Sequence, residues 1–137
     1  MMETTGLGMT VHLSMDFETV LSRTVEALKA EGFGVLTEID VKETLRKKLD
    51  VDFRPYRILG ACNPALAYRA LIAAPEAGLL LPCNVTISQH DVDTVEVAIV
   101  DPLVMLSITA NDDLKPIAEE AHARLSRVAA ALETTLS

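Results

Sequence analysis

Apolar residues recur at helical spacing in two stretches of the chain. In the first, residues 14–31, the apolar positions form a single helical stripe: Phe17, Val20, Leu21, Val25 and Leu28. Ser14 or Asp16 is placed to cap the start of this helix, and Gly32 suits the left-handed residue that ends it. The second stretch follows the cap candidates Asn111 and Asp113 and predicts a long terminal helix. Its apolar face is narrow and rich in alanine, which favours close packing on a sheet: Leu114, Ile117, Ala118, Ala121, Leu125, Val128 and Leu132.

Five shorter segments have the character of strands. Residues 7–13 alternate weakly, and residues 34–40 and 56–62 are two further predicted strands. From Cys83 the pattern changes to a period of two: residues 83–89 and 94–101 flank a turn at residues 90–93, as in a β-hairpin. Asp40 and Glu43 resemble a capping box, and the short helix behind them is expected to carry Val41, Leu45 and Leu49 inward. Asn63 and Pro64 open another helix, residues 65–74, which must stop near Pro75.

Strands and helices therefore mix without strict alternation, which predicts an α+β fold. We expect a single mixed, largely antiparallel sheet of about five strands with helices packed on it. A length of 137 residues fits one domain spanning residues 1–137, with its core at about residues 7–136. An apolar face left uncovered by so thin a layer would be covered by a second copy, so a homodimer is expected.

Composition and charge narrow the classes of partner. The formal net charge is −8, which repels phosphate backbones and predicts no nucleic-acid partner and no membrane partner. The N-terminus lacks the pattern of a secretory signal, and the longest apolar region, residues 70–83, is too short and too broken to span a bilayer. We expect a cytoplasmic protein, in which the two cysteines are reduced at rest.

The two cysteines are the strongest candidates for chemistry, because each is followed by asparagine. Cys62 ends a predicted strand just before a helix N-terminus, a position that lowers the pKa of a thiol. Cys83 begins the next strand, so antiparallel pairing of the two strands would bring both sulfurs to one edge of the sheet. The alternative is that both are core residues, since free cysteine packs like a small hydrophobic residue.

Other candidate residues surround this loop. Asn63 and Asn84 offer amide donors to a ligand, and Tyr68 and Arg69 follow on the same predicted helix. Residues of this type also pair with surface carboxylates. No metal site is expected: a CxxC motif is absent, and the three histidines lie in separate predicted elements, where each is expected to be solvated: His12, His90 and His122. Whether a cofactor is bound, and which one, stays unknown at this point.

Three segments, "GFGVLTEIDV", "PYRILGACNP" and "GLLLPCNV", resemble the bacterial and archaeal family known as domain of unknown function 302. The resemblance covers nearly the whole chain. It implies a compact α+β domain that commonly forms dimers, and it implies no established reaction. The recurring motif residues map to six positions: Cys62, Asn63, Pro64, Pro82, Cys83 and Asn84. Many relatives carry histidine where this chain has Tyr68, which weakens a Cys–His mechanism here.

Three functional hypotheses follow. The first is a small-molecule-binding or thiol-redox module, with Cys62 and Cys83 as reactive thiols and Asn63, Asn84, Tyr68 and Arg69 as ligand contacts. The second is a non-catalytic homodimerising interaction domain whose cysteines fill the core. The third is a metal-binding protein. Whether the protein is an enzyme stays open at this point.

Overall fold

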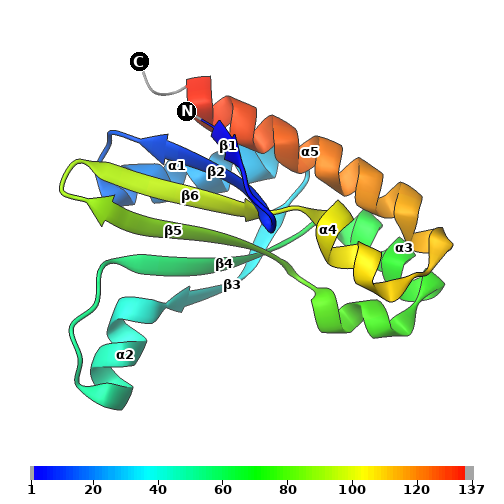
Figure 1. Ribbon diagram of the computed structural model, residues 1–137, viewed down its shortest axis with the longest axis horizontal. Helices are drawn as coiled ribbons and strands as arrows, with labels where there is room; N and C mark the ends of the chain where they lie inside the picture. The colour runs from blue at the N-terminus through cyan, green and yellow to red at the C-terminus, as the bar shows by residue number, and fades with distance from the viewer. Residues whose placement is uncertain (1, 135–137) are drawn as a thin grey trace.

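The computed structural model describes residues 2–134, and these form one six-stranded sheet in the order β1-β2-β6-β5-β4-β3 (Figure 1). All neighbouring strands pair antiparallel. The strands are β1 (Met2–Thr4), β2 (Gly8–Leu13), β3 (Gly34–Asp40), β4 (Tyr56–Cys62), β5 (Cys83–Asp91) and β6 (Thr94–Val100). The α+β class is confirmed, but the sheet has six strands rather than about five. The additional strand, β1, is short, and all three of its residues are exposed, so no alternation of apolar residues marks it.

Helices α1 (Phe17–Ala30) and α5 (Lys115–Glu133) pack on one face of this sheet (Figure 1). Alternate residues of the strands point toward these helices and are buried: Met9, Val11, Leu13, Val85, Ile87, Val95, Val97 and Ile99. The intervening residues lie on the opposite face, which is more exposed. Ala129 of α5 is buried in the core against the sheet, which agrees with the packing expected for the terminal helix, whereas Ala118 and Ala121 are buried in a second cluster against other helices.

A second, smaller apolar cluster lies at one end of the sheet. It is built from α3 (Pro64–Ala73), the 3-10 turn η1 (Pro75–Leu80), α4 (Pro102–Leu106), the turn η3 (Asp112–Leu114) and the start of α5. The turn η2 (Ser107–Thr109), none of whose residues is buried, connects α4 to η3. The buried members of the cluster are Leu66, Ala70, Ala77, Leu106, Leu114, Ile117, Ala118 and Ala121. The peptide bond between Leu81 and Pro82, which leads from this cluster into β5, is cis.

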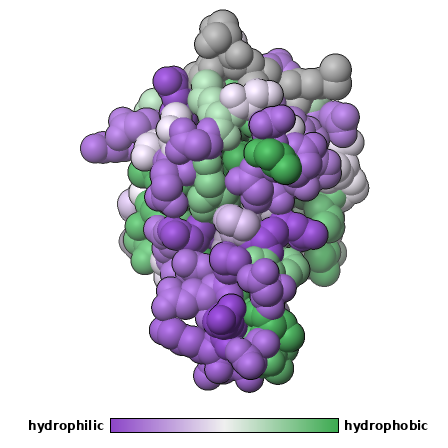
Figure 2. All heavy atoms as spheres, turned by 90° about the vertical axis from the view of Figure 1, so that its left-hand side faces the viewer, coloured by the Kyte–Doolittle hydropathy of each residue, from purple (hydrophilic) through white to green (hydrophobic). Residues whose placement is uncertain are grey.

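Helix α2 (Val41–Leu49) projects from the sheet beyond β3 (Figure 1). The expectation that it carries Val41, Leu45 and Leu49 inward is wrong: none of its residues is buried, and Leu49 is 65% exposed. It follows an edge strand, so no further layer covers it. Figure 2 views this end of the molecule and shows a largely hydrophilic surface with apolar side chains in a few spots.

Three helix caps predicted from the sequence form as expected, at Asp16, Asp40 and Asn63. The prediction that Asn111 or Asp113 caps the terminal helix is wrong: Asn111 caps the short turn η3, and α5 starts after Leu114 without a side-chain cap. The carboxylate of Asp16 accepts the N–H of Thr19 at 3.1 Å, and that of Asp40 accepts the N–H of Glu43 at 3.0 Å. These bonds satisfy amide donors that a helix N-terminus leaves without a partner. Within residues 2–134, no helix is both long enough and apolar enough to cross a membrane.

Gly32 ends α1 in the left-handed conformation, with φ +85°. We predict that Gly32→Ala lowers the free energy of unfolding by about 1–2 kcal/mol, because an L side chain is strained at this φ. A Cβ there would also lie 2.9 Å from Nδ2 of Asn63. Urea unfolding measures the loss.

Gly34→Ala is the matched control for this change. Gly34 has no heavy atom within 4 Å of an added Cβ and no positive φ. Its substitution should leave the stability nearly unchanged, and equal losses for the two variants would contradict the argument from backbone conformation.

Candidate functional site

Strands β4 and β5 bring the two Cys-Asn motifs together. Gly60 lies opposite Asn84 and Ala61 opposite Cys83, in antiparallel register. Cys62 is the next residue of β4, so both cysteines lie at the same end of the strand pair. The antiparallel pairing on which the joint cysteine site depends is therefore present. Neither cysteine forms a disulfide.

Both cysteines line one pocket of about 260 Å³ where the two apolar clusters meet. The sheet contributes Ala61, Cys62 and Cys83, the loop before β5 contributes Leu81 and Pro82, and the helices close the other sides. The helical lining is apolar throughout: Leu66, Ala67, Ala70, Leu71, Met105, Leu106, Ile117 and Ala121. The pocket carries no charged side chain.

The position of Cys62 before a helix predicts a lowered thiol pKa, but the structure raises the pKa of both thiols. Burial raises the pKa of Cys83 from 9.0 to about 11, and the neighbouring Cys62 thiol adds to this effect. Burial also raises the pKa of Cys62, which is less enclosed. Desolvation by the apolar lining thus outweighs any stabilisation of a thiolate by the α3 N-terminus. At neutral pH both side chains are neutral thiols.

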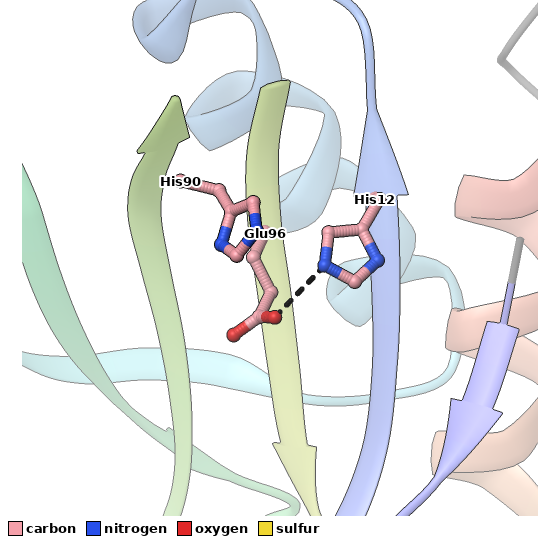
Figure 3. A group of neighbouring side chains, drawn as sticks. All are labelled: His12, His90 and Glu96. Atoms are coloured by element: carbon pink, nitrogen blue, oxygen red, sulfur yellow. Dashed lines mark ion pairs between the residues drawn. The ribbon is translucent and has the colours of Figure 1, made fainter. Parts of the chain in front are cut away.

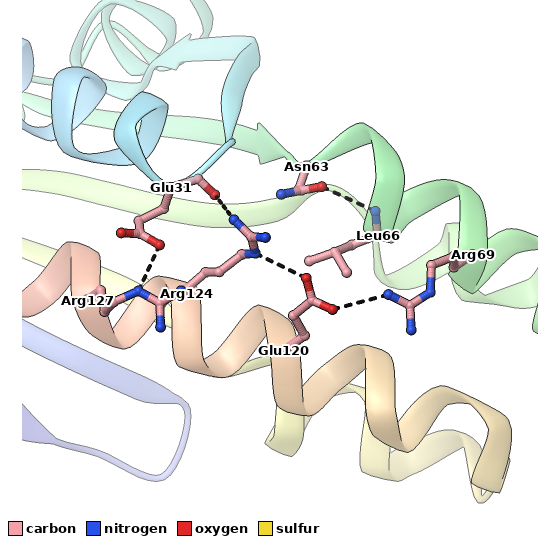
Figure 4. Close-up of polar contacts among 7 residues, drawn as sticks. All are labelled: Glu31, Asn63, Leu66, Arg69, Glu120, Arg124 and Arg127. Atoms are coloured by element: carbon pink, nitrogen blue, oxygen red, sulfur yellow. Dashed lines mark hydrogen bonds and ion pairs between the residues drawn. The ribbon is translucent and has the colours of Figure 1, made fainter.

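The side chain of Asn63 forms a hydrogen bond with the backbone of α3. Its Oδ1 accepts the N–H of Leu66 at 3.2 Å and caps α3, as the sequence predicts (Figure 4). Its amide also packs closely against Gly32, where an added Cβ would lie 2.9 Å from Nδ2. Asn63 lines the pocket, so it is the predicted ligand contact that the structure places beside both cysteines.

The other three predicted ligand contacts lie elsewhere. Asn84 is exposed on the opposite face of the sheet, where it lines a separate cavity with Tyr56 and Thr86. Tyr68 is 68% exposed and is not among the residues that line the cysteine pocket. Arg69 pairs with Glu120 through Nη1 and Oε1 at 3.2 Å. The structure therefore does not bring these three residues to the thiols.

Ion pairs and a hydrogen bond connect α3 and the end of α1 to α5 beside the pocket (Figure 4). Glu120 on α5 accepts from Arg69 on α3 and from Arg124 one turn along α5, each at 3.2 Å. Arg124 also donates to the carbonyl oxygen of Glu31 at 3.0 Å. These two arginines lower the pKa of the Glu120 carboxyl through hydrogen bonds. Arg69, a candidate ligand contact, thus has a structural partner.

The expectation that the three histidines are scattered is wrong for two of them. His12 and His90 lie with their ring centroids 5.2 Å apart, next to Glu96. His122 is separate and pairs with Asp101 at 2.9 Å. The sequence placed His90 in a turn, whereas the structure places it inside β5.

Comparison with known proteins identifies the family. The model of the family described as "Domain of unknown function DUF302" matches residues 9–132. The chain belongs to the DUF302 family. It is also similar to an uncharacterised conserved DUF302 protein from Bacillus stearothermophilus, whose crystal structure has 33% sequence identity and a TM-score of 0.82. That match covers 90% of this chain and 95% of the other. The curated proteins contain no match.

The sequence of this DUF302 chain also contains a helix-start signal for α4, a helix that lines part of the pocket and was not predicted. Asp101 and Pro102 begin α4, with the Asp101 carboxylate accepting the N–H of Leu103 at 2.9 Å. This is the same combination of cap and first-turn proline that opens α3 at Asn63 and Pro64. Helix α4 supplies Met105 and Leu106 to the pocket.

The raised pKa values predict slow thiol chemistry. At neutral pH the shift lowers the thiolate fraction of Cys83 about a hundredfold, and the thiolate is the form that reacts. We expect iodoacetamide at pH 7 to label Cys62 before Cys83, and both more slowly in the native protein than in urea. Labelling of Cys83 should accelerate as the pH rises toward 11.

Peptide mass spectrometry of protein quenched at intervals gives the two rates separately. The cysteines of the urea-unfolded chain are the internal reference. Native labelling at pH 7 that is faster than in urea would show an activated thiol and would contradict the effect assigned to burial.

Proposed function

We propose that this DUF302 protein binds a small, neutral, largely apolar molecule in the pocket between Cys62, Cys83 and helix α3. The observation that carries the proposal is the lining itself, which is apolar around a pocket of about 260 Å³. This size lies just below the range of roughly 300–1,000 Å³ typical of sites for drug-sized ligands. The ligand is therefore a small one.

The absence of charge in the lining supports a neutral ligand. Between Arg69 and Lys115 the sequence contains no lysine or arginine, and this interval supplies the pocket residues from Ala70 to Leu106. An anionic group entering the pocket would lose its hydration without gaining a counter-charge, which is costly. A carboxylate analogue should therefore bind more weakly than the alcohol of the same chain length.

In this proposal the thiol groups of the two cysteines contact the bound ligand. Neutral thiols are small, polarisable and weakly hydrogen-bonding, which suits them to an apolar lining. A thiol-redox role remains the related alternative, and the shared pocket of Cys62 and Cys83 supports it. Burial, which favours the neutral thiols, weighs against it.

A matched pair of substitutions on α3 tests the pocket. Ala67 lines it and is half-buried, whereas Ala65 is exposed on the same helix and does not line it. We predict that 1-hexanol shifts the backbone amide signals of the pocket residues in the wild-type protein. Ala67→Phe should weaken this binding at least about tenfold by filling the pocket, and Ala65→Phe should leave it unchanged.

Titration followed by two-dimensional ¹⁵N nuclear magnetic resonance measures the affinities, and the same spectra show that each variant is folded. Hexanoate serves as the charged comparison and should bind more weakly than 1-hexanol. Shifts that spread over the whole surface, or that persist equally in Ala67→Phe, would refute a pocket of this kind.

Homodimerisation is a second candidate, favoured by apolar side chains in and beside the segments that line the pocket. Leu36, which lines it, is 67% exposed, and Leu79, next to the lining residue Gly78, is 86% exposed. Exposed apolar groups of this kind are typical of association surfaces. A second copy of the chain would remove them from water.

Sedimentation velocity tests this candidate. We predict a dimer at micromolar concentration that dissociates in the double variant Leu36→Ser, Leu79→Ser. The matched control is Val92→Ser, because Val92 is also an exposed apolar residue but lies in the β5–β6 turn at the other end of β5. A wild-type protein that sediments as a monomer would remove the dimer while leaving the ligand proposal to its own test.

A further inference from the structure

Two histidines and a glutamate converge on the face of the sheet opposite α1 and α5 (Figure 3). They come from three neighbouring strands: His12 from β2, Glu96 from β6 and His90 from β5. His12 and Glu96 lie directly opposite each other in the β2–β6 register. Nε2 of His12 is 2.9 Å from Oε2 of Glu96.

A β-bulge brings His90 into this group. Gln89 pairs with Val95 and Asp91 pairs with Thr94, so His90 is the extra residue of β5. Bulges of this kind redirect a side chain and often occur beside functional sites. Here the His90 ring lies near Glu96 on the same face as His12, and the two imidazole rings meet edge to face at 5.2 Å.

We propose that His12, His90 and Glu96 bind a divalent first-row transition-metal ion such as Zn²⁺. Each residue offers one ligand atom, and these atoms all lie within 4.8 Å of one another. Two imidazole nitrogens and one carboxylate oxygen are a donor set used for zinc and for non-haem iron. Metal–nitrogen bonds of about 2.0–2.1 Å require ligand atoms no more than about 4.2 Å apart. Small side-chain rotations reach this distance.

The charge around the group favours a cation. No lysine or arginine precedes Arg23, and none lies between Arg69 and Lys115, so strands β1, β2, β5 and β6 contain no lysine or arginine. The end of β5 adds Asp91, and the β5–β6 turn adds Asp93. Acidic side chains on strands that contain no lysine or arginine favour the binding of a cation.

The ion pair between His12 and Glu96 does not by itself account for His90. Among residues 2–134, no hydrogen bond is formed by either ring nitrogen of His90, although its ring is held beside the pair. A shared metal ion gives this ring a ligand role. Three protein ligands also leave coordination positions for water or an oxygen donor.

A cavity next to the metal-binding group could hold a ligand for these open coordination positions. Glu96 lines a cavity of about 330 Å³ on the same face, together with Tyr56, Asn84 and Thr86. A small molecule with an oxygen donor, held in this cavity, would lie beside the metal ion. Asn84, which the sequence marks as a ligand contact, belongs to this cavity and not to the cysteine pocket.

Calorimetric titration of the metal-free protein with Zn²⁺ tests the proposal. We expect one ion per chain, and an affinity at least about tenfold weaker in His90→Ala and in Glu96→Gln, because each removes a direct ligand. His90 is exposed, so its substitution leaves the fold intact. His122→Ala removes a histidine outside the group and should bind as the wild type does.

Cys62→Ser separates this site from binding by thiols and should also retain wild-type affinity. Co²⁺ provides a spectroscopic check: its visible bands should appear without near-ultraviolet thiolate absorption, and they should disappear in His90→Ala. Zinc binding that is unchanged in His90→Ala and Glu96→Gln, or lost in Cys62→Ser, would overturn the proposal.

Discussion

The register of strand β5 is the constraint on which both candidate sites depend. β5 pairs with β4 on one side and with β6 on the other, and burial of Val85 and Ile87 against the helices determines which face each residue occupies. Because side chains alternate in a strand, a shift of one residue would move every buried side chain to the exposed face. The same register places Cys83 toward the apolar clusters at one end of the strand. At the other end, the bulge at His90 interrupts it and directs an imidazole to the open face.

Two opposing effects act on the thiol at the start of α3, and their outcome determines the kind of chemistry that the pocket supports. A helix N-terminus stabilises an anion, but this effect is confined to the first turn and is modest. Removing a thiolate from water into an apolar lining opposes ionisation more strongly, which is why the pKa values of Cys62 and Cys83 rise. Asn63 strengthens this outcome, since it already satisfies the N–H of Leu66, one of the amides that would otherwise face an anion. The pocket is thus better suited to apolar contact than to nucleophilic attack.

Much of this fold is readable from local sequence signals, because local physics produces them. Asp16, Asp40 and Asn63 cap helices as their positions predict, and the bounds of β3 and β4 match the predicted strands. Features that depend on long-range pairing were missed. β1 has no apolar alternation and forms only against β2. The neighbours His12 and Glu96 come from strands more than eighty positions apart, and His90 joins them through a bulge whose residue has no distinctive sequence signal. The family resemblance marked the Cys-Asn motifs, but it did not indicate that Asn84 faces away from Cys83.

The two faces of the sheet explain why the two sites favour opposite chemistry. The pocket is enclosed between the end of the sheet and helices α3, α4 and α5, so its lining is apolar and penalises any charge that enters. The His12–His90–Glu96 group lies on the face opposite α1 and α5, where nearby carboxylates stabilise a cation. The sheet separates the two sites, and each draws its lining side chains from a different set of β5 residues. Because the two sites share no side chain, we expect a ligand in the pocket and an ion on the open face to bind independently of each other. Loss of one site leaves the residues of the other intact.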